Sequence, residues 1–178
     1  MTGLNRSTFP VQLELTFRLA TRADLSKLEW YGQYSHFRTV FRRTFNEQEQ
    51  RRRLMLVADC ADFPIGHVFI QLNNGERNFW DNRARAYFYS LRVMEMFRGK
   101  GIGSRLIEEA EEMVKELGFG WTTIAAAKEN PRARRLYERM GYRVFTEDDG
   151  DWSYLDHEGK VRHVHEPCWV LEKKLNVR

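Results

Sequence analysis

The segment Phe97-Arg98-Gly99-Lys100-Gly101-Ile102-Gly103 (FRGKGIG) stands between an extended apolar run and a long amphipathic helix pattern. A glycine-rich turn between a strand and a helix presents unpaired backbone N–H groups at the positive end of the helix dipole. Its glycines let a ligand approach the main chain closely, because no Cβ atom intervenes. Arg98 and Lys100 add positive charge. The segment therefore predicts a site for a phosphate-bearing ligand.

The spacing of the glycines excludes two common phosphate-binding loops. A Walker loop requires G-x-x-x-x-G-K-[ST], but Lys100 is followed by Gly101. The dinucleotide fingerprint G-x-G-x-x-G fails as well, because its last position falls on Ser104 or Leu106. What remains is the spacing R-x-x-G-x-G, which begins at Arg98.

This spacing resembles the pyrophosphate loop, [QR]-x-x-G-x-[GA], of the GNAT superfamily of acyl-CoA-dependent N-acetyltransferases. A second segment, Asn130 to Tyr142 (NPRARRLYERMGY), resembles the N-x-x-A-x-x-L-Y-x-x-x-G-[FY] segment of the same family. The order strand, loop, helix, strand, helix between the two segments also fits. The resemblance extends from about Phe88 to Phe145, and outside this range it rests on element order.

The resemblance implies acetyl-CoA as co-substrate and names the residues that would bind it. The main chain of Leu91, Arg92 and Val93 would pair with the pantetheine amides, as one strand edge pairs with another. A main-chain N–H in that stretch would stabilise the oxyanion. Asn130 caps its helix and could also bond the pantetheine. The expected cofactor-binding residues are Leu91, Arg92, Val93, Arg98, Gly99, Lys100, Gly101, Ile102, Gly103, Ser104, Asn130, Ala133 and Tyr137.

Tyr137 occupies the position where the family often has its general acid. Acetyl transfer from a thioester to an amine needs a neutral amine, a donor for the oxyanion and a proton for the departing thiolate. A tyrosine with an unperturbed pKa of about 10 is protonated at neutral pH and is close in pKa to an alkyl thiol. The alternative is that Tyr137 only packs with Leu136 and Met140 on its helix. On the basis of the family resemblance, we expect Tyr137 to act as the general acid.

No carboxylate is clearly marked as the general base. Asp59, Asp62 and Glu95 are candidates at predicted strand ends, and a chain of water molecules is an equal alternative. Glu95 stands where the family often has a proline. The aromatic-rich segments 30–37 and 152–165 are expected to line a partly apolar pocket for the amine acceptor.

The hydrophobic pattern predicts an α/β (α+β) fold with a mixed sheet, and the resemblance implies a GNAT-like sheet of the same kind. Hairpins around βαβ crossovers imply about seven strands with helices on both faces, and the resemblance implies that the central parallel strands splay apart. In the helix after the glycine loop, apolar residues including Leu117 form one face, and a row of glutamates including Glu111 forms a solvated face. Strands are expected at 13–19, 54–59, 65–72, 84–93, 121–127, 142–146, 152–155, 161–165 and 168–175, and helices at 21–32, 37–53, 102–117 and 130–141.

Length and composition indicate one domain over residues 1–178 with a sizeable core. Lys and Arg exceed Asp and Glu by 29 to 25, a mild excess that favours anionic ligands without implying a nucleic-acid partner. Two cysteines are too few for a disulfide framework and favour a cytoplasmic location. The sequence contains no apolar run of about 18 residues, so we expect no membrane-spanning helix. His163 and His165 lack a third ligand at suitable spacing, so we expect no metal.

We therefore expect an N-acetyltransferase that moves an acetyl group from acetyl-CoA to a primary amine by direct attack. Neither Cys60 nor Cys168 lies in a motif, which argues against an acyl-cysteine intermediate. The acceptor is a small-molecule or peptide amine, which the fold alone does not specify. The alternatives are a non-catalytic acyl-CoA-binding sensor of the same fold and an RNA-associated protein that uses the basic segments 42–43 and 51–53. We leave open a homodimer.

Overall fold

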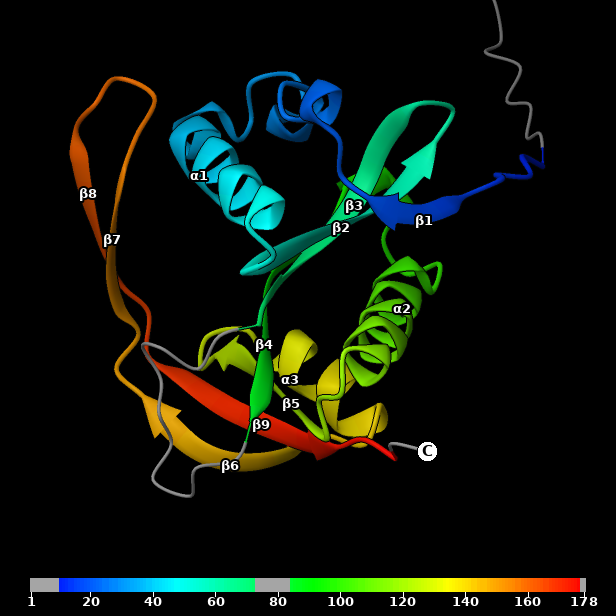
Figure 1. The fold of residues 1–178 in the computed structure, drawn as a ribbon, viewed down its shortest axis with the longest axis vertical. Helices are drawn as coiled ribbons and strands as arrows, with labels where there is room; N and C mark the ends of the chain where they lie inside the picture. The colour runs from blue at the N-terminus through cyan, green and yellow to red at the C-terminus, as the bar shows by residue number, and fades with distance from the viewer. Residues whose placement is uncertain (1–9, 73–83, 177–178) are drawn as a thin grey trace, which may run out of the picture.

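The computed structural model describes residues 10–72 and 84–176, and its main feature is a seven-stranded sheet in the order β1-β2-β3-β4-β5-β9-β6 (Figure 1). The strands of this sheet are β1 (Thr16–Leu19), β2 (Arg53–Cys60), β3 (Phe63–Gln71), β4 (Arg85–Val93), β5 (Trp121–Ala127), β6 (Arg143–Asp148) and β9 (Cys168–Lys174). A separate two-stranded ribbon consists of β7 (Asp151–Leu155) and β8 (Val161–His165).

Helices cover both faces of the sheet, as the sequence predicts: α1 (Arg38–Glu49) lies on one face, and α2 (Ile102–Glu116) lies on the other (Figure 1). Alternate residues of β2 belong to two different cores, because side chains of a strand point to opposite faces. Leu56 joins the core beneath α2 and α3 (Pro131–Arg139), whereas Met55 joins the core beneath α1. No helix in the described part of the chain could span a membrane.

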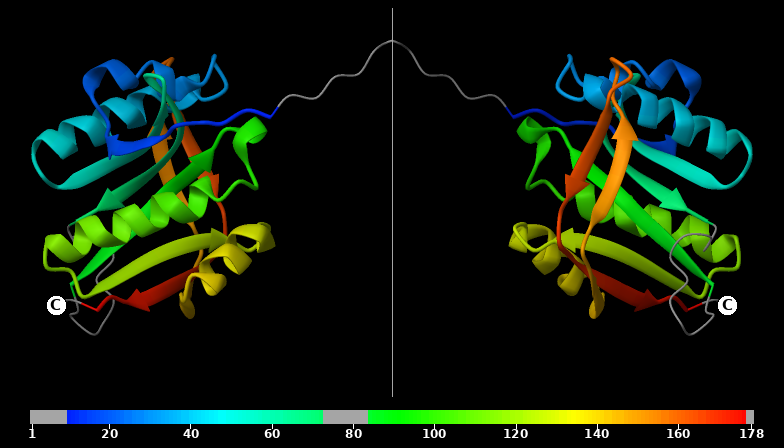
Figure 2. Two further views of the ribbon diagram at one scale, coloured as in Figure 1. Left: turned by 90° about the vertical axis from the view of Figure 1, so that its right-hand side faces the viewer. Right: turned by 90° about the vertical axis from the view of Figure 1, so that its left-hand side faces the viewer.

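The central strands β4 and β5 are parallel, and they separate halfway along. Their pairing runs from Arg85 opposite Trp121 to Phe88 opposite Ile124. Beyond this point β4 continues to Val93 and β5 continues on its own course, so the two strands diverge from a common end (Figure 2). The splayed sheet that the resemblance implies is therefore present.

A β-bulge interrupts β4 where it leaves β5. The register with β3 shifts between the pairs Phe69–Tyr89 and His67–Arg92, which leaves one extra residue in β4. Ser90 within the bulge has φ +55°, in the left-handed region that non-glycine residues rarely adopt. As a result, Tyr89 and Arg92 face the same side of the sheet, toward α1.

The predicted first helix, 21–32, is wrong as a single α-helix. The structure has three one-turn 3₁₀-helices before α1: η1 (Arg22–Asp24), η2 (Lys27–Glu29) and η3 (Ser35–Phe37). Trp30 and Tyr31 have positive φ values of 43° and 58°, which an α-helix cannot accommodate. The Trp30 indole N–H donates to the Pro64 carbonyl at 2.8 Å, so burial of this side chain holds the chain in the turn.

Two positions on α2 also differ from the prediction. Glu111, expected on the solvated face, is buried, because the later strand β9 brings the ammonium group of Lys173 to its carboxylate. Leu117, expected on the apolar face, is 55% exposed, because α2 ends at Glu116. The first strand also begins later than predicted, at Thr16.

Candidate active site

The glycine loop connects β4 to α2 through a one-turn helix, η4 (Glu95–Phe97). Gly99 and Gly101 have φ +74° and +83°, so any L-residue would be strained at either position. A Cβ atom at either glycine would meet nothing within 4 Å. The loop thus needs its glycines for conformation, and the space above it is open to a ligand.

The start of α2 leaves backbone donors available beside this open space. The N–H of Arg105 donates to the Gly101 carbonyl at 3.0 Å, so the N–H groups of Ile102, Gly103 and Ser104 precede the first intrahelical bond. Three donors at the positive end of a helix form a suitable site for a phosphate group. Lys100 is exposed next to them.

The side chain of Arg98 has a structural role. Its Nε donates to the main-chain carbonyl of Val93 at 2.9 Å, which ties the loop to the end of β4. Gly103 differs from the two earlier glycines, because a Cβ atom there would lie 3.9 Å from both Leu136 and Val93, which is ordinary contact. An alanine would fit at this position, in agreement with the last letter of the [QR]-x-x-G-x-[GA] pattern.

The structure brings the second motif segment against the first. Asn130 accepts a hydrogen bond from the Ala133 N–H at 3.1 Å, which confirms the predicted cap, and Pro131 takes the first turn. Leu136 and Ala133 pack on the core beneath α2. Since a Cβ atom on Gly103 would lie 3.9 Å from Leu136, the middle of α3 packs beside the start of α2.

Tyr137 is buried, with 5% of its surface exposed. Burial, with a smaller effect from Tyr87, raises the pKa of Tyr137 well above the value of about 10 expected from the sequence. Its ring centroid lies 6.3 Å from that of Tyr142. No side chain among the described residues hydrogen-bonds to its hydroxyl group. The hydroxyl therefore stays protonated at neutral and moderately alkaline pH.

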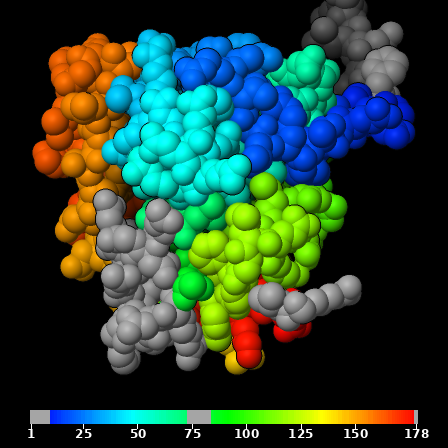
Figure 3. All heavy atoms as spheres, viewed as in Figure 1, coloured from blue at the N-terminus to red at the C-terminus, as the bar shows by residue number. Residues whose placement is uncertain are grey.

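The two aromatic-rich segments are in contact, although more than a hundred residues separate them. Phe37 lies 5.0 Å from Tyr154 and 6.3 Å from Trp152, measured between ring centroids. The Thr39 hydroxyl donates to the Asp156 carbonyl at 3.1 Å. Figure 3 shows the β7–β8 ribbon (orange) lying beside α1 (cyan) on the surface. Trp152 is 43% exposed, so it is reachable by a ligand.

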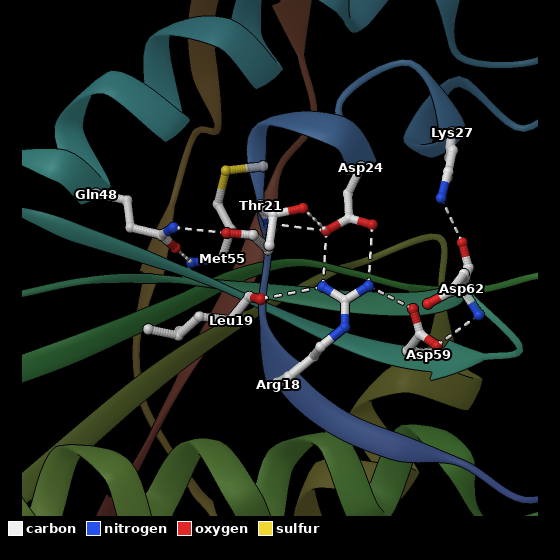
Figure 4. Close-up of polar contacts among 10 residues, drawn as sticks. Arg18, Leu19, Thr21, Asp24, Lys27, Gln48, Met55, Asp59 and Asp62 are labelled. Atoms are coloured by element: carbon white, nitrogen blue, oxygen red, sulfur yellow. Dashed lines mark hydrogen bonds and ion pairs between the residues drawn. The ribbon is translucent and has the colours of Figure 1, made fainter.

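The three candidate carboxylates lie in different environments. Asp59 is buried and forms an ion pair with Arg18, and it also accepts from the Asp62 N–H at 3.0 Å (Figure 4). Asp62 is exposed in the turn between β2 and β3. Glu95 is exposed in η4, between the end of β4 and the glycine loop. Glu95 is thus the candidate closest in sequence to the loop.

Two polar side chains near the splay carry no signal that sequence analysis recognised. Arg92 faces α1 and lies over the rings of Tyr34 and Phe37. His67, opposite Arg92 on β3, is fully buried, and no described residue bonds to its ring nitrogens. Burial and the charge of Arg92 lower the pKa of His67 well below its ordinary value, so His67 is a neutral core group. The position of His67 inside the apolar run PIGHVFI (64–70) is the sequence feature that could have indicated a buried histidine.

Two cavities lie on the surface away from the glycine loop. One of about 580 Å³ lies between η1, η2 and α1 and includes Arg22 and Arg42 in its lining. The other, of about 420 Å³, lies beside the β7–β8 ribbon and includes Trp152, His163 and His165 in its lining. Neither lining includes a residue of β4, β5 or the glycine loop. Within residues 10–72 and 84–176, no group of three His, Cys, Asp or Glu side chains could hold a metal ion.

The fold and the two motif segments agree with the comparison to known families. Residues 20–142 match the profile of the Acetyltransferase (GNAT) family, and the chain belongs to this family. It is 31% identical over 86 residues to the uncharacterized N-acetyltransferase YdgE of Bacillus subtilis, covering 43% of this chain and 55% of that protein. It is 32% identical over 82 residues to thialysine N-epsilon-acetyltransferase of Bos taurus, covering 46% and 47%. The chain spans about half the length of the curated relatives it matches.

Solved structures show the same fold over nearly the whole chain. Arabidopsis thaliana NAA60 in complex with acetyl-CoA aligns with a TM-score of 0.70 and 21% identity, covering 92% of this chain and 99% of that chain. The ribosomal-protein-S18-alanine N-acetyltransferase from Escherichia coli aligns with a TM-score of 0.66 and 16% identity, covering 93% and 96%. These similarities confirm the predicted GNAT-like fold class.

Proposed function

We propose that the protein is an N-acetyltransferase that transfers an acetyl group from acetyl-CoA to a primary amine, as one domain spanning residues 1–178. The observation that carries the proposal is the divergence of β4 from β5 directly before an open glycine loop at a helix start. The NAA60 structure with this fold contains acetyl-CoA. Cys60 and Cys168 form no disulfide, which is consistent with a cytoplasmic location, which we also propose.

In this proposal the loop and the strand end bind the co-substrate. The N–H groups from Gly99 to Ser104 bind the pyrophosphate, because they stand at the positive end of α2 and open space lies beside Gly99 and Gly101. The main chain from Leu91 to Val93 pairs with the pantetheine amides, since the pairing of β4 with β5 ends at Phe88. Asn130 and Ala133 at the start of α3 complete the binding site, together with Tyr137.

Tyr137 acts as general acid in the proposed step. The amine nitrogen attacks the thioester carbonyl carbon, the C–S bond breaks, and the Tyr137 hydroxyl gives its proton to the departing sulfur. The amine loses its extra proton to water or to Glu95. The raised pKa of Tyr137 makes it a weaker acid than the sequence predicted. A buried thiolate is destabilised by the same loss of solvent, which raises the thiol pKa and restores part of the match.

Free thiol release from acetyl-CoA in the presence of a panel of amines tests this function directly. An N-acetyltransferase releases thiol only with an amine present, and mass spectrometry finds the acetylated amine. A non-catalytic acyl-CoA-binding sensor binds CoA in calorimetry but releases no thiol with any amine. Absence of CoA binding would contradict both functions.

A further inference from the structure

The guanidinium group of Arg92 lies over two aromatic rings on the α1 side of the sheet. Its central carbon is 4.9 Å from the ring centroid of Tyr34 and 4.8 Å from that of Phe37. Stacking of this kind holds a planar guanidinium in place and leaves its N–H groups pointing outward in the plane. Arg92 is half-buried, so its edge is accessible to a ligand.

The N–H groups of Arg92 are only partly used. One donates to the Ser90 hydroxyl within the bulge. A guanidinium has five N–H donors in a fixed fork, so donors remain available. A carboxylate is the ligand that matches this fork, because it accepts two parallel hydrogen bonds.

Arg92 differs from the other partly buried arginines in having no carboxylate partner. Among the residues that the structure describes, no carboxylate lies within ion-pair distance of Arg92, and Glu166 affects it only at longer range. The buried Arg85 and the other partly buried arginines in the described chain are ion-paired, namely Arg18, Arg38, Arg53 and Arg134. Buried charges in proteins are normally paired with an opposite charge, so the Arg92 guanidinium would be stabilised by a bound anion.

Arg92 lies on the α1 side of the sheet, where we expect the amine acceptor to bind. Arg92 follows the bulge at Ser90, where β4 has left β5, and it faces α1. Burial lowers the pKa of nearby His36, and the positive charges of Arg92 and Arg162 lower it further, while the Asp156 carboxylate acts in the opposite direction. Arg162 is ion-paired with Asp156, so the guanidinium group of Arg92 is the cation here that favours a bound anion.

We propose that the Arg92 side chain binds a carboxylate group of the acceptor, so that the preferred acceptor is a free amino acid. This inference rests on the proposed acetyltransferase function. The carboxylate must stand within a few bonds of the amine, because Arg92 is only two residues beyond Ser90 at the splay. The side chain of the acceptor would pack on Phe37, Tyr154 and Trp152, which favours an aromatic amino acid.

Matched acceptors test the inference on the unmodified protein. We compare kcat/KM for L-phenylalanine, L-phenylalaninamide, phenethylamine and spermidine. L-phenylalanine is expected to exceed L-phenylalaninamide by about 10- to 100-fold, the range for hydrogen bonds to a charged group. The amide has the more acidic amine, which by itself favours the amide. A peptide amide beginning with aspartate reveals whether a side-chain carboxylate of a peptide can replace that of a free amino acid.

Variants then assign the preference to Arg92. In Arg92→Gln the ratio of kcat/KM for L-phenylalanine over L-phenylalaninamide is expected to fall to 1 or below, because the charged partner is removed and the more acidic amine of the amide then decides the preference. A ratio measured on one variant cancels any general loss of activity. Arg43→Gln is the matched control, because it removes the same charge from an exposed position on α1 and should retain the ratio.

Equal use of L-phenylalanine and L-phenylalaninamide by the unmodified protein, or an unchanged ratio in Arg92→Gln, would overturn the inference. If no amine releases thiol, the proposed function fails instead. Calorimetry of the CoA complex then tests the carboxylate site alone, since L-phenylalanine should bind more tightly than its amide. Equal affinities of the two compounds would show that Arg92 does not bind a carboxylate.

Discussion

The Nζ atom of Lys173 lies 2.9 and 2.7 Å from the two carboxylate oxygens of Glu111, which ties β9 to α2 inside the protein. Glu111 is buried, and Lys173 is partly exposed. Lys173→Met would leave a buried carboxylate without its cation, and we expect it to lower the free energy of unfolding by about 3 kcal/mol. Urea unfolding measures this. The double variant with Glu111→Leu should recover most of the loss, and no recovery would contradict a role for the charge.

Gly101→Asp should weaken CoA binding. Gly101 has φ +83° and open space above it, so an aspartate there adds both backbone strain and a negative charge beside the expected phosphates. Like charges within a few ångströms justify an expected loss of about 10-fold or more in affinity, measured by calorimetry. Gly159→Asp is a matched control, because Gly159 has φ +78° and open space in the β7–β8 turn. Undiminished affinity in folded Gly101→Asp would refute the loop assignment.

Tyr137→Phe should lower kcat by about 100-fold or more and leave CoA affinity nearly unchanged, because only the proton for the departing sulfur is removed. Tyr142→Phe is the matched control. Tyr142 is a buried tyrosine 6.3 Å away, and its hydroxyl bonds to Thr122 at 3.1 Å. The control should lose about 1 kcal/mol of stability but little activity. An unchanged kcat in Tyr137→Phe would remove Tyr137 from the mechanism.

The stabilising contribution of the Asp24 carboxylate should be lost in acid, so the free energy of unfolding should fall at low pH. Burial alone would raise the pKa of its carboxyl group, but hydrogen bonds from Arg18 and Thr21 outweigh burial and lower it to about 2 (Figure 4). A lowered pKa in the folded state stabilises the protein above the unfolded pKa, and this contribution of about 2 kcal/mol is lost as the pH falls from about 4 to 2.

Urea unfolding at several pH values checks this dependence. Asp24→Asn should be less stable at neutral pH and should lose less stability between pH 4 and 2, as a variant without this carboxylate must. Asp149→Asn, at an exposed turn, controls for the change in charge and should behave like the unmodified protein. An equal acid dependence in Asp24→Asn would refute the assignment to Asp24.

The parts of the site that could be predicted from sequence are those encoded locally. The glycine loop and the Asn130 cap depend on the backbone preferences of adjacent residues, so their spacing is visible in the chain. The bulge at Ser90 is not, because it arises from the register of β4 against β3. The ion pair of Glu111 with Lys173 joins positions 62 residues apart, and the hydrophobic periodicity of the sequence does not predict it.

The failure of the predicted first helix has the same origin. Thr21 and Asp24 do form the expected hydrogen bonds, with the Thr21 N–H donating to Asp24 at 2.7 Å. No α-helix spans this segment, because the Trp30 indole N–H donates to the Pro64 carbonyl on β3 and Trp30 has a positive φ. A contact between distant segments therefore overrides a correct local signal. This turn also leads into the segment that places Tyr34 beside Arg92.

Trp152→Ala should raise KM for the amine far more than KM for acetyl-CoA. The Trp152 ring lies 5.2 Å from that of Tyr154 and 6.3 Å from that of Phe37, and it is 43% exposed, so it can contact an acceptor without being required for the core. Loss of ground-state binding raises KM while kcat changes little. Val161→Ala, an exposed position on the same ribbon, is the control and should leave both KM values unchanged. Steady-state kinetics with each substrate varied in turn measures the two values. Equal increases in both KM values, or a large loss of thermal stability, would mean that Trp152 supports the fold and that the acceptor binds elsewhere.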